Sequence, residues 1–181
     1  MSKRVRAYIG LGSNVGDSRA ALARAVRALD ALPGARLGGV SRLYRTRPVG
    51  VIDQPDFLNA VVALDVPAGP DPETGGLALL SALKMLEWSF GRRARQRWGP
   101  REIDLDLLVF GRHRIHAERP DGRWLDVPHA RARDRLFVLA PLADVAAGLR
   151  PPGWGETVET ARRRQAEAEG EGAVQVVGTI S

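Results

Sequence analysis

Two aspartates one residue apart are the feature of this 181-residue sequence that best suits chemistry. Asp104 and Asp106 lie in a segment whose alternating apolar and polar residues predict a strand. In a strand both carboxylates project from one face, with side-chain origins roughly 6–7 Å apart. Such a pair repels itself unless a cation lies between the two groups, and a site made only of oxygen ligands favours Mg²⁺ over zinc or copper. A solvated edge strand with two incidental acids is the alternative interpretation.

An arginine cluster comes immediately before the acidic pair. Residues 91–101 read Gly-Arg-Arg-Ala-Arg-Gln-Arg-Trp-Gly-Pro-Arg and contain five arginines. Because arginine donates paired hydrogen bonds to phosphate oxygens, cations and acids on one loop–strand unit predict a Mg²⁺–nucleotide site. A basic surface loop with local salt bridges would have the same composition.

Two further positions carry weaker signals. Phe57 and Asn59 lie two apart at the start of a strand and so share a face, where an aromatic plane beside an amide would suit a flat heterocycle. Core packing is the default alternative for Phe57. His129 lies beside a second basic cluster, from Arg131 to Arg135, and fits either phosphate binding or a solvated turn.

The glycine-rich segment 10–16 follows a predicted strand and precedes a predicted helix, which invites comparison with phosphate-binding loops. It matches neither the dinucleotide nor the nucleoside-triphosphate loop pattern, and no lysine follows it. We therefore interpret it as a tight turn in which Asn14 makes one side-chain contact.

The elements that must position these residues alternate between strands and helices. Apolar periodicity and turn residues predict strands over 4–10, 35–45, 57–66 and 102–110, and helices over 18–32 and 73–90. The order βαββαβ is the split-βαβ, ferredoxin-like arrangement of α+β proteins. We expect an antiparallel sheet with both helices on one face, which leaves the other face and the loops at the sheet ends for a ligand.

The pattern after residue 110 is weaker. It predicts a hairpin over 111–116, a strand or turn near 135–139 and a short helix over 141–147. The polar run 162–172 suits a frayed helix or disorder. We therefore expect a main domain over 1–150 and a partly flexible C-terminal extension over 151–181.

Composition limits the class of protein. The chain has 27 Lys+Arg against 21 Asp+Glu, a formal charge of +6 that suggests a polyanionic partner. It has no cysteine, which excludes disulfides, thiolate metal sites and a cysteine nucleophile. No stretch reaches the ~18 apolar residues of a membrane span. We expect a cytoplasmic protein with no membrane partner.

Four blocks of this sequence resemble the 6-hydroxymethyl-7,8-dihydropterin pyrophosphokinase family of folate biosynthesis. They are Ala7-Tyr-Ile-Gly-Leu-Gly-Ser-Asn14, Tyr44-Arg-Thr46 through Asp53-Gln-Pro-Asp-Phe-Leu-Asn-Ala60, Arg97-Trp-Gly-Pro-Arg-Glu-Ile-Asp-Leu-Asp-Leu-Leu108, and Val127-Pro-His129 through Arg135-Leu-Phe137. They occur in the family's order and spacing across residues 5–146. The resemblance implies a ferredoxin-like α+β fold and transfer of pyrophosphate from ATP to the pterin's hydroxymethyl oxygen, with release of AMP.

The resemblance also implies the residues of the site. Two Mg²⁺ ions would be held by Asp104 and Asp106, and Arg92 and Arg101 would join them as catalytic residues. The ATP side would be lined by Glu87, Arg92, Trp98, Arg101, Asp126, Val127, His129 and Arg135. The pterin side would be lined by Thr46, Arg47, Val49, Phe57, Asn59 and Phe137, with the ring between the two phenylalanines.

Three features depart from the family's pattern. Phe57 stands where tyrosine is common, which keeps stacking and removes the hydroxyl. Lys84 stands where the family has a glutamine beside the nucleotide, so we do not expect that contact here. Arg93 and Arg95 both match the second arginine of the basic loop.

A non-enzymatic nucleic-acid binder is the competing class, because ferredoxin-like sheets also bind RNA. The sequence lacks a run of strand aromatics, and aromatic residues make up only 6% of the chain. An acidic pair in the most basic region also opposes binding to a phosphate backbone. We therefore expect ATP and the pterin as partners, no nucleic acid, and a monomer.

Overall fold

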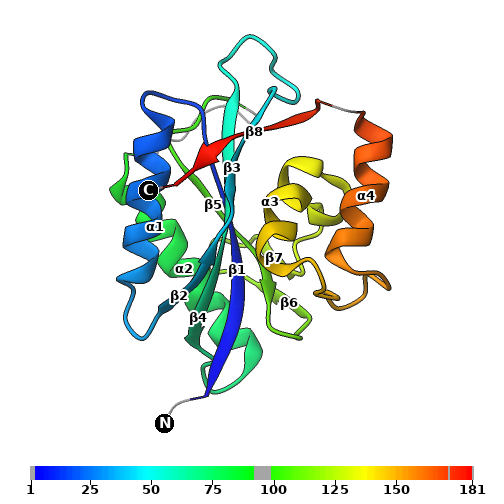
Figure 1. Ribbon diagram of the computed structural model, residues 1–181. Coiled ribbons are helices and arrows are strands. Elements are labelled where there is room, and N and C mark those ends of the chain that lie inside the picture. Colours follow the sequence, from blue (N-terminus) through cyan, green and yellow to red (C-terminus); the bar gives the residue numbers. More distant parts are fainter. Residues whose placement is uncertain (1–2, 92–98, 171, 181) are drawn as a thin grey trace.

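The computed structural model describes residues 3–91, 99–170 and 172–180 of the chain (Figure 1). Its elements are, in chain order, β1 (Arg4–Ser13), α1 (Ser18–Asp30), β2 (Arg36–Val40), β3 (Arg42–Thr46), β4 (Phe57–Pro67), α2 (Pro72–Ser89), β5 (Asp104–Phe110), β6 (Ile115–Glu118), β7 (Trp124–Val127), the short 3₁₀ helix η1 (Ala132–Asp134), α3 (Leu136–Ala146), α4 (Val158–Glu169) and β8 (Val174–Thr179). None of the helices in these ranges is long and apolar enough to cross a bilayer.

The main sheet is antiparallel, with the strand order β5-β1-β4-β3-β8 and with β2 also paired to β4. β1 lies between β5 and β4, and it pairs with β4 from Arg4 opposite Pro67 to Ser13 opposite Leu58. The first four predicted strands thus form the ferredoxin-like order, and the expected fold class is confirmed. β6 and β7 form a separate hairpin, which begins later than the predicted 111–116.

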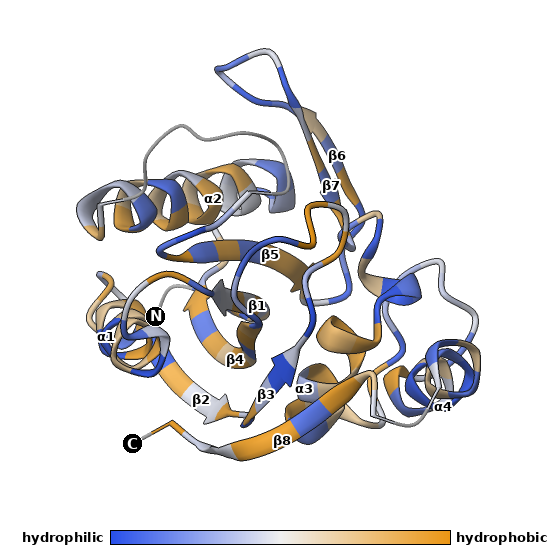
Figure 2. Ribbon diagram, turned by 90° about the horizontal axis from the view of Figure 1, so that it is seen from above, coloured by the Kyte–Doolittle hydropathy of each residue, from blue (hydrophilic) through white to orange (hydrophobic). Residues whose placement is uncertain are grey.

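The helices α1 and α2 cover one face of this sheet, as the sequence predicted (Figure 2). Both begin at an aspartate, because Asp17 accepts a hydrogen bond from the backbone of Ala20 and Asp71 from that of Thr74. Their apolar sides pack with the inward-facing residues of β1, β4 and β5 into the larger core. Members of this core include Leu22 and Leu29 of α1, Leu80 and Leu83 of α2, and Ile9, Val62 and Leu105 of the strands.

The opposite face of the sheet is partly covered by α3. Our expectation that this face stays open for a ligand was therefore wrong for the part that α3 covers. Leu139 and Leu142 of α3 pack against Val61 and Leu108 of the sheet in a second apolar core. The sequence pattern predicted a strand or turn near 135–139 and a helix only over 141–147, whereas α3 begins at Leu136. The helix is apolar on most of its surface, which hides the helical period.

Two strand boundaries also differ from the predictions. β1 continues past Gly10 to Ser13, because its backbone pairs with β4 on one side and, as far as Gly12, with β5 on the other. The predicted strand 35–45 is split into β2 and β3 at Ser41. The backbone N–H of Ser41 donates to Val61 O, and its hydroxyl accepts from the N–H of Val61.

The C-terminal segment forms α4 and β8. Thr157 caps α4 by accepting from the backbone of Thr160, and the helix runs through most of the polar stretch that we interpreted as frayed or disordered. β8 extends the sheet at its β3 edge, and Arg19 of α1 donates to the backbone oxygens of Val177 and Thr179. The flexibility expected for residues 151–181 stays a prediction.

Candidate active site

A cavity of about 390 Å³ lies where β1, β4 and β5 meet the segment after β3, the start of α3 and the last residue of α4. It brings together ten of the residues expected from the sequence. They are Thr46, Arg47, Val49, Phe57, Asn59, Arg101, Asp104, Asp106, Arg135 and Phe137. The cavity is therefore the candidate active site, and its size suits a small-molecule ligand.

The acidic pair forms one wall of this cavity. Leu105 is buried in the core between Asp104 and Asp106, so both carboxylates face the cavity as strand alternation predicts. Burial raises the pKa of Asp106, and the negative charge of Asp104 raises it further. Arg101 Nη1 donates to Asp104 Oδ2, whereas no hydrogen bond from the described residues reaches Asp106. Bringing a cation to this wall would remove the repulsion between the two carboxylates.

Glycines provide the floor beside the acidic pair, a contribution that sequence reasoning missed. In the ladder between β1 and β5, Gly10 lies opposite Asp106 and Gly12 lies opposite Asp104. A Cβ on Gly12 would come within 3.2 Å of Asn59 Oδ1, and one on Gly10 within 3.4 Å of the Leu108 side chain. The first part of the glycine-rich segment thus belongs to β1, which ends at Ser13, and only residues 14–16 leave the strand as expected for a turn. The missing side chains of Gly10 and Gly12 leave room next to the carboxylates.

Behind the acidic pair, α2 holds the backbone of β5. Glu87 Oε1 accepts from Leu105 N at 2.7 Å and from Lys84 Nζ at 2.8 Å, and Lys84 Nζ also donates to Leu105 O at 3.0 Å. Burial raises the pKa of Glu87, although Lys84 opposes this change. Glu87 was expected on the ATP side, but it is not among the residues that line the cavity. It and Lys84 instead clamp the residue that separates the two aspartates.

Asn14 fixes the position of Arg101. Its Oδ1 accepts from Arg101 N at 2.8 Å, and its own backbone N–H donates to Arg101 O at 3.0 Å. Its amide group also donates to Gln54 Oε1 and to Pro55 O, both at 2.9 Å. We expected one side-chain contact from Asn14, and the structure gives three, which join β1, the loop before β4 and the arginine that precedes the acidic pair.

The other wall of the cavity carries aromatic and amide groups. Asn59 Nδ2 donates to Thr46 Oγ1 at 2.8 Å, and both side chains are buried. Phe57 at the start of β4 and Phe137 at the start of α3 both line the cavity. The guanidinium of Arg135 lies 5.5 Å from the centre of the Phe137 ring, and burial, together with the charge of Arg131, lowers the pKa of Arg135. An anion in the cavity would offset this crowding of positive charge.

Several expected residues lie elsewhere. Asp126 is half exposed on β7, where it pairs with His116 at 2.7 Å, and Val127 is buried in the larger core. His129 accepts the backbone N–H of Arg131 at Nδ1, and like Asp126 and Val127 it does not line the cavity. Arg92 and Trp98 lie outside the described residues, as do Arg93 and Arg95, the two candidates for the second loop arginine.

The residues present fit a magnesium ion. Within residues 3–91, 99–170 and 172–180, no group of three or more acidic, histidine or cysteine side chains could enclose a metal. Mg²⁺ commonly takes one or two carboxylates and completes its shell with water and substrate phosphates. A rigid carboxylate pair in a cavity that also holds Arg101 and Arg135 matches this pattern, and the oxygen-only donors match the ion's preference.

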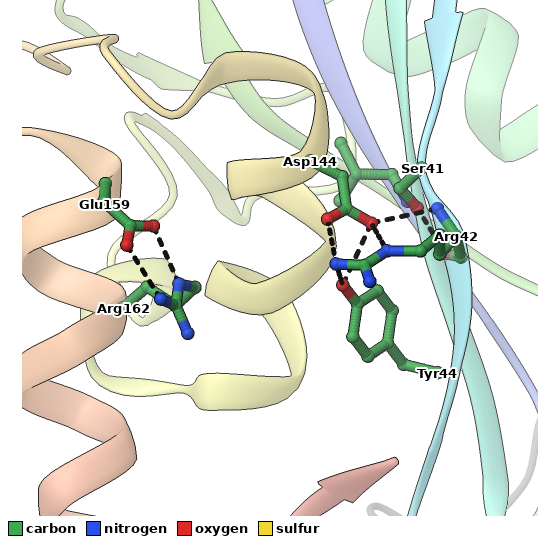
Figure 3. Close-up of polar contacts among 7 residues, drawn as sticks. Ser41, Arg42, Tyr44, Asp144, Glu159 and Arg162 are labelled. Atoms are coloured by element: carbon green, nitrogen blue, oxygen red, sulfur yellow. Dashed lines mark hydrogen bonds and ion pairs between the residues drawn. The ribbon is translucent and has the colours of Figure 1, made fainter. Parts of the chain in front are cut away.

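A second cavity, of about 440 Å³, lies between β3, α3, α4 and β8 and has a different character. Asp144 of α3 accepts from Arg42 Nη2 at 2.7 Å and from the Tyr44 hydroxyl at 2.9 Å, and Glu159 pairs with Arg162 (Figure 3). Burial raises the pKa of Tyr44 to about 12, and its bond to Asp144 adds to this shift. The charged groups shown there balance one another, so this cavity offers less to a charged ligand.

Comparison with known proteins adds to this picture. Residues 8–147 match the model of the 7,8-dihydro-6-hydroxymethylpterin-pyrophosphokinase (HPPK) family. The chain is 44% identical over 147 residues to a 2-amino-4-hydroxy-6-hydroxymethyldihydropteridine pyrophosphokinase of Pseudomonas aeruginosa, an alignment that covers 81% of this chain and 84% of the relative. It is 45% identical over 156 residues to the Methylorubrum extorquens protein of the same name, covering 86% and 90%.

Among solved structures, the chain resembles the wild-type HPPK-DHPS of Plasmodium falciparum, with a TM-score of 0.76 and 14% identity. The match covers the whole of this chain and 50% of that one. At this level of identity the likeness supports the fold alone.

Proposed function

The chain belongs to the HPPK family and is a pyrophosphokinase of folate biosynthesis, and we propose that the cavity between β5 and α3 is where ATP and the hydroxymethyl pterin meet. The observation that carries this proposal is that one cavity holds two contrasting walls. One wall is an acidic pair with arginines, which suits a metal-bound triphosphate, and the other is an amide between aromatic rings, which suits a flat heterocycle. The acceptor and the donor of the reaction would then lie side by side.

On the triphosphate side, Asp104 and Asp106 would hold two Mg²⁺ ions together with phosphate oxygens. When bound, Mg²⁺ neutralises phosphate charge and orients the reacting oxygens. Arg101 is held at its backbone by Asn14 and would present its guanidinium to the transferred group. Arg135, which precedes α3, would neutralise phosphate charge from that side of the cavity. Arg92 and Trp98 belong to the same proposal through the family resemblance.

On the pterin side, Phe57 and Phe137 would stack on the two faces of the ring. One amide N–H of Asn59 is engaged by Thr46, so Oδ1 would accept from the amino edge of the ring. Thr46, Arg47 and Val49 would border the same subsite. These contacts bind and orient the acceptor without changing its chemistry.

The chemical step would be an in-line attack of the pterin hydroxyl oxygen on the β-phosphorus of ATP. The bond from that phosphorus to the α–β bridging oxygen breaks, AMP leaves, and the hydroxyl proton passes to water. Positioning and charge neutralisation carry most of the catalysis in such transfers. The rigid β5 strand and the clamped Leu105 suit this task, because they hold the acidic pair in place before substrate arrives.

A coupled assay tests the proposal directly. The purified chain is incubated with ATP, Mg²⁺ and the reduced pterin, and AMP is measured with each component left out in turn. We expect AMP only when all three are present, and we expect a chelator to abolish it until Mg²⁺ is restored in excess. AMP formed at the same rate without pterin would overturn the substrate assignment, and full activity in chelator would overturn the metal site. Sedimentation of the same sample tests the proposed monomer.

A further inference from the structure

The C-terminal segment contributes to the cavity although it lies beyond residues 8–147, which match the family model. Glu169, the last residue of α4, is among the residues that line the cavity. Figure 1 shows α4 beside α3, with β8 crossing back from α4 to the β3 edge of the sheet. The extension therefore lies next to the two elements, β3 and α3, that border the pterin side.

Glu169 supplies a cap that α3 lacks in its own sequence. The residue before the helix is Arg135, and its side chain makes no capping hydrogen bond. Glu169 Oε1 accepts from the backbone N–H of Leu136 at 3.0 Å, and Gln165 Nε2 holds the same oxygen at 2.8 Å. The first N–H groups of a helix need an outside acceptor, and a carboxylate there also interacts favourably with the helix dipole.

A second contact holds the turn that leads into α3. Glu156, in the loop before α4, pairs with Arg133 at 2.8 Å, and Arg164 donates to the backbone oxygen of Arg133 at 3.1 Å. The segment from Arg133 to Leu136 is thus fastened at two points, both from residues after 147. This segment passes directly into the part of the cavity that holds Phe137.

The capped residue lies between two residues of the cavity. Leu136 is buried, while its neighbours Arg135 and Phe137 both line the cavity. Fixing the N–H of Leu136 fixes the direction in which these two side chains leave the backbone. A helix end without this acceptor would be free to shift or fray by a residue, and both side chains would move with it.

We propose that Glu169 is a positioning residue for the active site, which holds the start of α3 so that Arg135 and Phe137 are oriented for ATP and the pterin. This inference rests on the proposed function, because it takes Arg135 and Phe137 as substrate contacts. The C-terminal extension would then contribute to substrate binding through Glu169.

The test compares Glu169→Ala, Glu169→Gln and Glu167→Ala by steady-state kinetics, well below the melting temperature of each variant. Glu167 is exposed on the same helix, so its replacement removes the same charge without the cap. We expect Glu169→Ala to raise the KM for pterin and for ATP three- to tenfold with kcat within twofold of wild type, because binding residues are displaced. Glu169→Gln keeps an acceptor oxygen and should stay within twofold of wild type, as should Glu167→Ala.

A double-variant comparison shows whether the effect passes through Phe137. In a Phe137→Ala background, adding Glu169→Ala should leave the pterin KM unchanged, because the side chain that it positions is gone. Unchanged KM values in Glu169→Ala, with or without a lower melting temperature, would overturn the positioning role. A Glu169→Gln variant as impaired as Glu169→Ala would also overturn it.

The same data separate this inference from the proposed function. If Phe137→Ala raises the pterin KM and Glu169→Ala does not, the positioning role fails and the site assignment stands. If neither Phe137→Ala nor Arg135→Ala changes any KM, the site assignment fails, and the role of Glu169 fails with it.

Discussion

Two carboxylate centres lie toward opposite ends of α3, and their charge is met in opposite ways. Near the last turn, Asp144 accepts hydrogen bonds from both Arg42 and Tyr44. Near the first turn, Asp106 lies beside Asp104 on one wall of the cavity, and the two carboxylates repel each other. The protein thus supplies hydrogen-bond donors to the carboxylate of Asp144, whereas we propose that a bound cation meets the charge of Asp106.

The pKa shifts record this difference. Burial would raise the pKa of Asp144, but the hydrogen bonds from Arg42 and Tyr44 outweigh it and lower the pKa overall. For Asp106, burial and Asp104 act in the same direction and raise the pKa. Asp144 therefore stabilises the fold, whereas the repulsion between Asp104 and Asp106 would be relieved by the proposed cation, as is common at sites that bind charged ligands.

The largest expected effect comes from removing the acidic pair. Asp104→Asn and Asp106→Asn should each lower turnover on the order of 10³-fold or more at saturating Mg²⁺, because the metal loses a ligand. Asp106→Asn should leave the melting temperature unchanged or higher, because it removes the repulsion with Asp104. Turnover and thermal unfolding of both variants check this, and a wild-type rate in either would refute the metal site.

Arg101→Ala should come next, with kcat lower by about 100-fold and the KM for ATP within about threefold, because its guanidinium is expected to act mainly on charge that develops in the transition state. Arg112→Ala, which removes an exposed arginine from the turn after β5, is the control of equal charge. Equal losses in kcat and in ATP binding for Arg101→Ala would contradict this role.

Asp144→Asn should reverse the pattern, affecting stability and sparing catalysis. We expect a loss of about 1–2 kcal/mol in the free energy of unfolding, since the partner Arg42 is 54% exposed and solvent screens the pair. The wild-type contribution is present above pH 3.8, the ordinary value for aspartate, and is lost as the pH falls through the lower folded pKa. Denaturant unfolding across this range checks it, with Glu118→Gln on β6 as control.

Tyr44→Phe gives the smallest effect. Because the folded pKa is about 12 against an ordinary 10.0, the wild-type protein should lose stability as the pH rises from 10 toward 12, and the variant should lose less. The chain has two tyrosines, so tyrosinate absorbance in Tyr44→Phe reports Tyr8 alone. Identical alkaline unfolding of variant and wild type would show that the pKa of Tyr44 is not raised in the folded protein.

The sequence predicted those parts of the fold whose period is visible in a single segment. Strand alternation placed Asp104 and Asp106 on one face, and the helical spacing of apolar residues predicted α1 and α2, because these features depend on local geometry alone. The helical period of α3 was obscured because the helix is apolar almost all round.

Parts of the site that depend on distant pairing escaped prediction. The role of Gly10 and Gly12 follows from the register between β1 and β5, and the cap from Glu169 joins residues 33 positions apart. Lys84 and Glu87 lie on a helical face whose contact with Leu105 depends on how α2 packs against β5. Spacing along the chain carries little information about such contacts.

The glycine floor has a consequence for inhibitor design. A compound that reaches past the acidic pair to Gly10 and Gly12 would rest on main-chain atoms, which no single substitution can remove. A new side chain at Gly12 would meet Asn59 Oδ1 at 3.2 Å, so a change that blocked the compound would also disturb an amide that the proposed pterin subsite needs. Resistance arising at this position would therefore carry a loss of substrate binding with it.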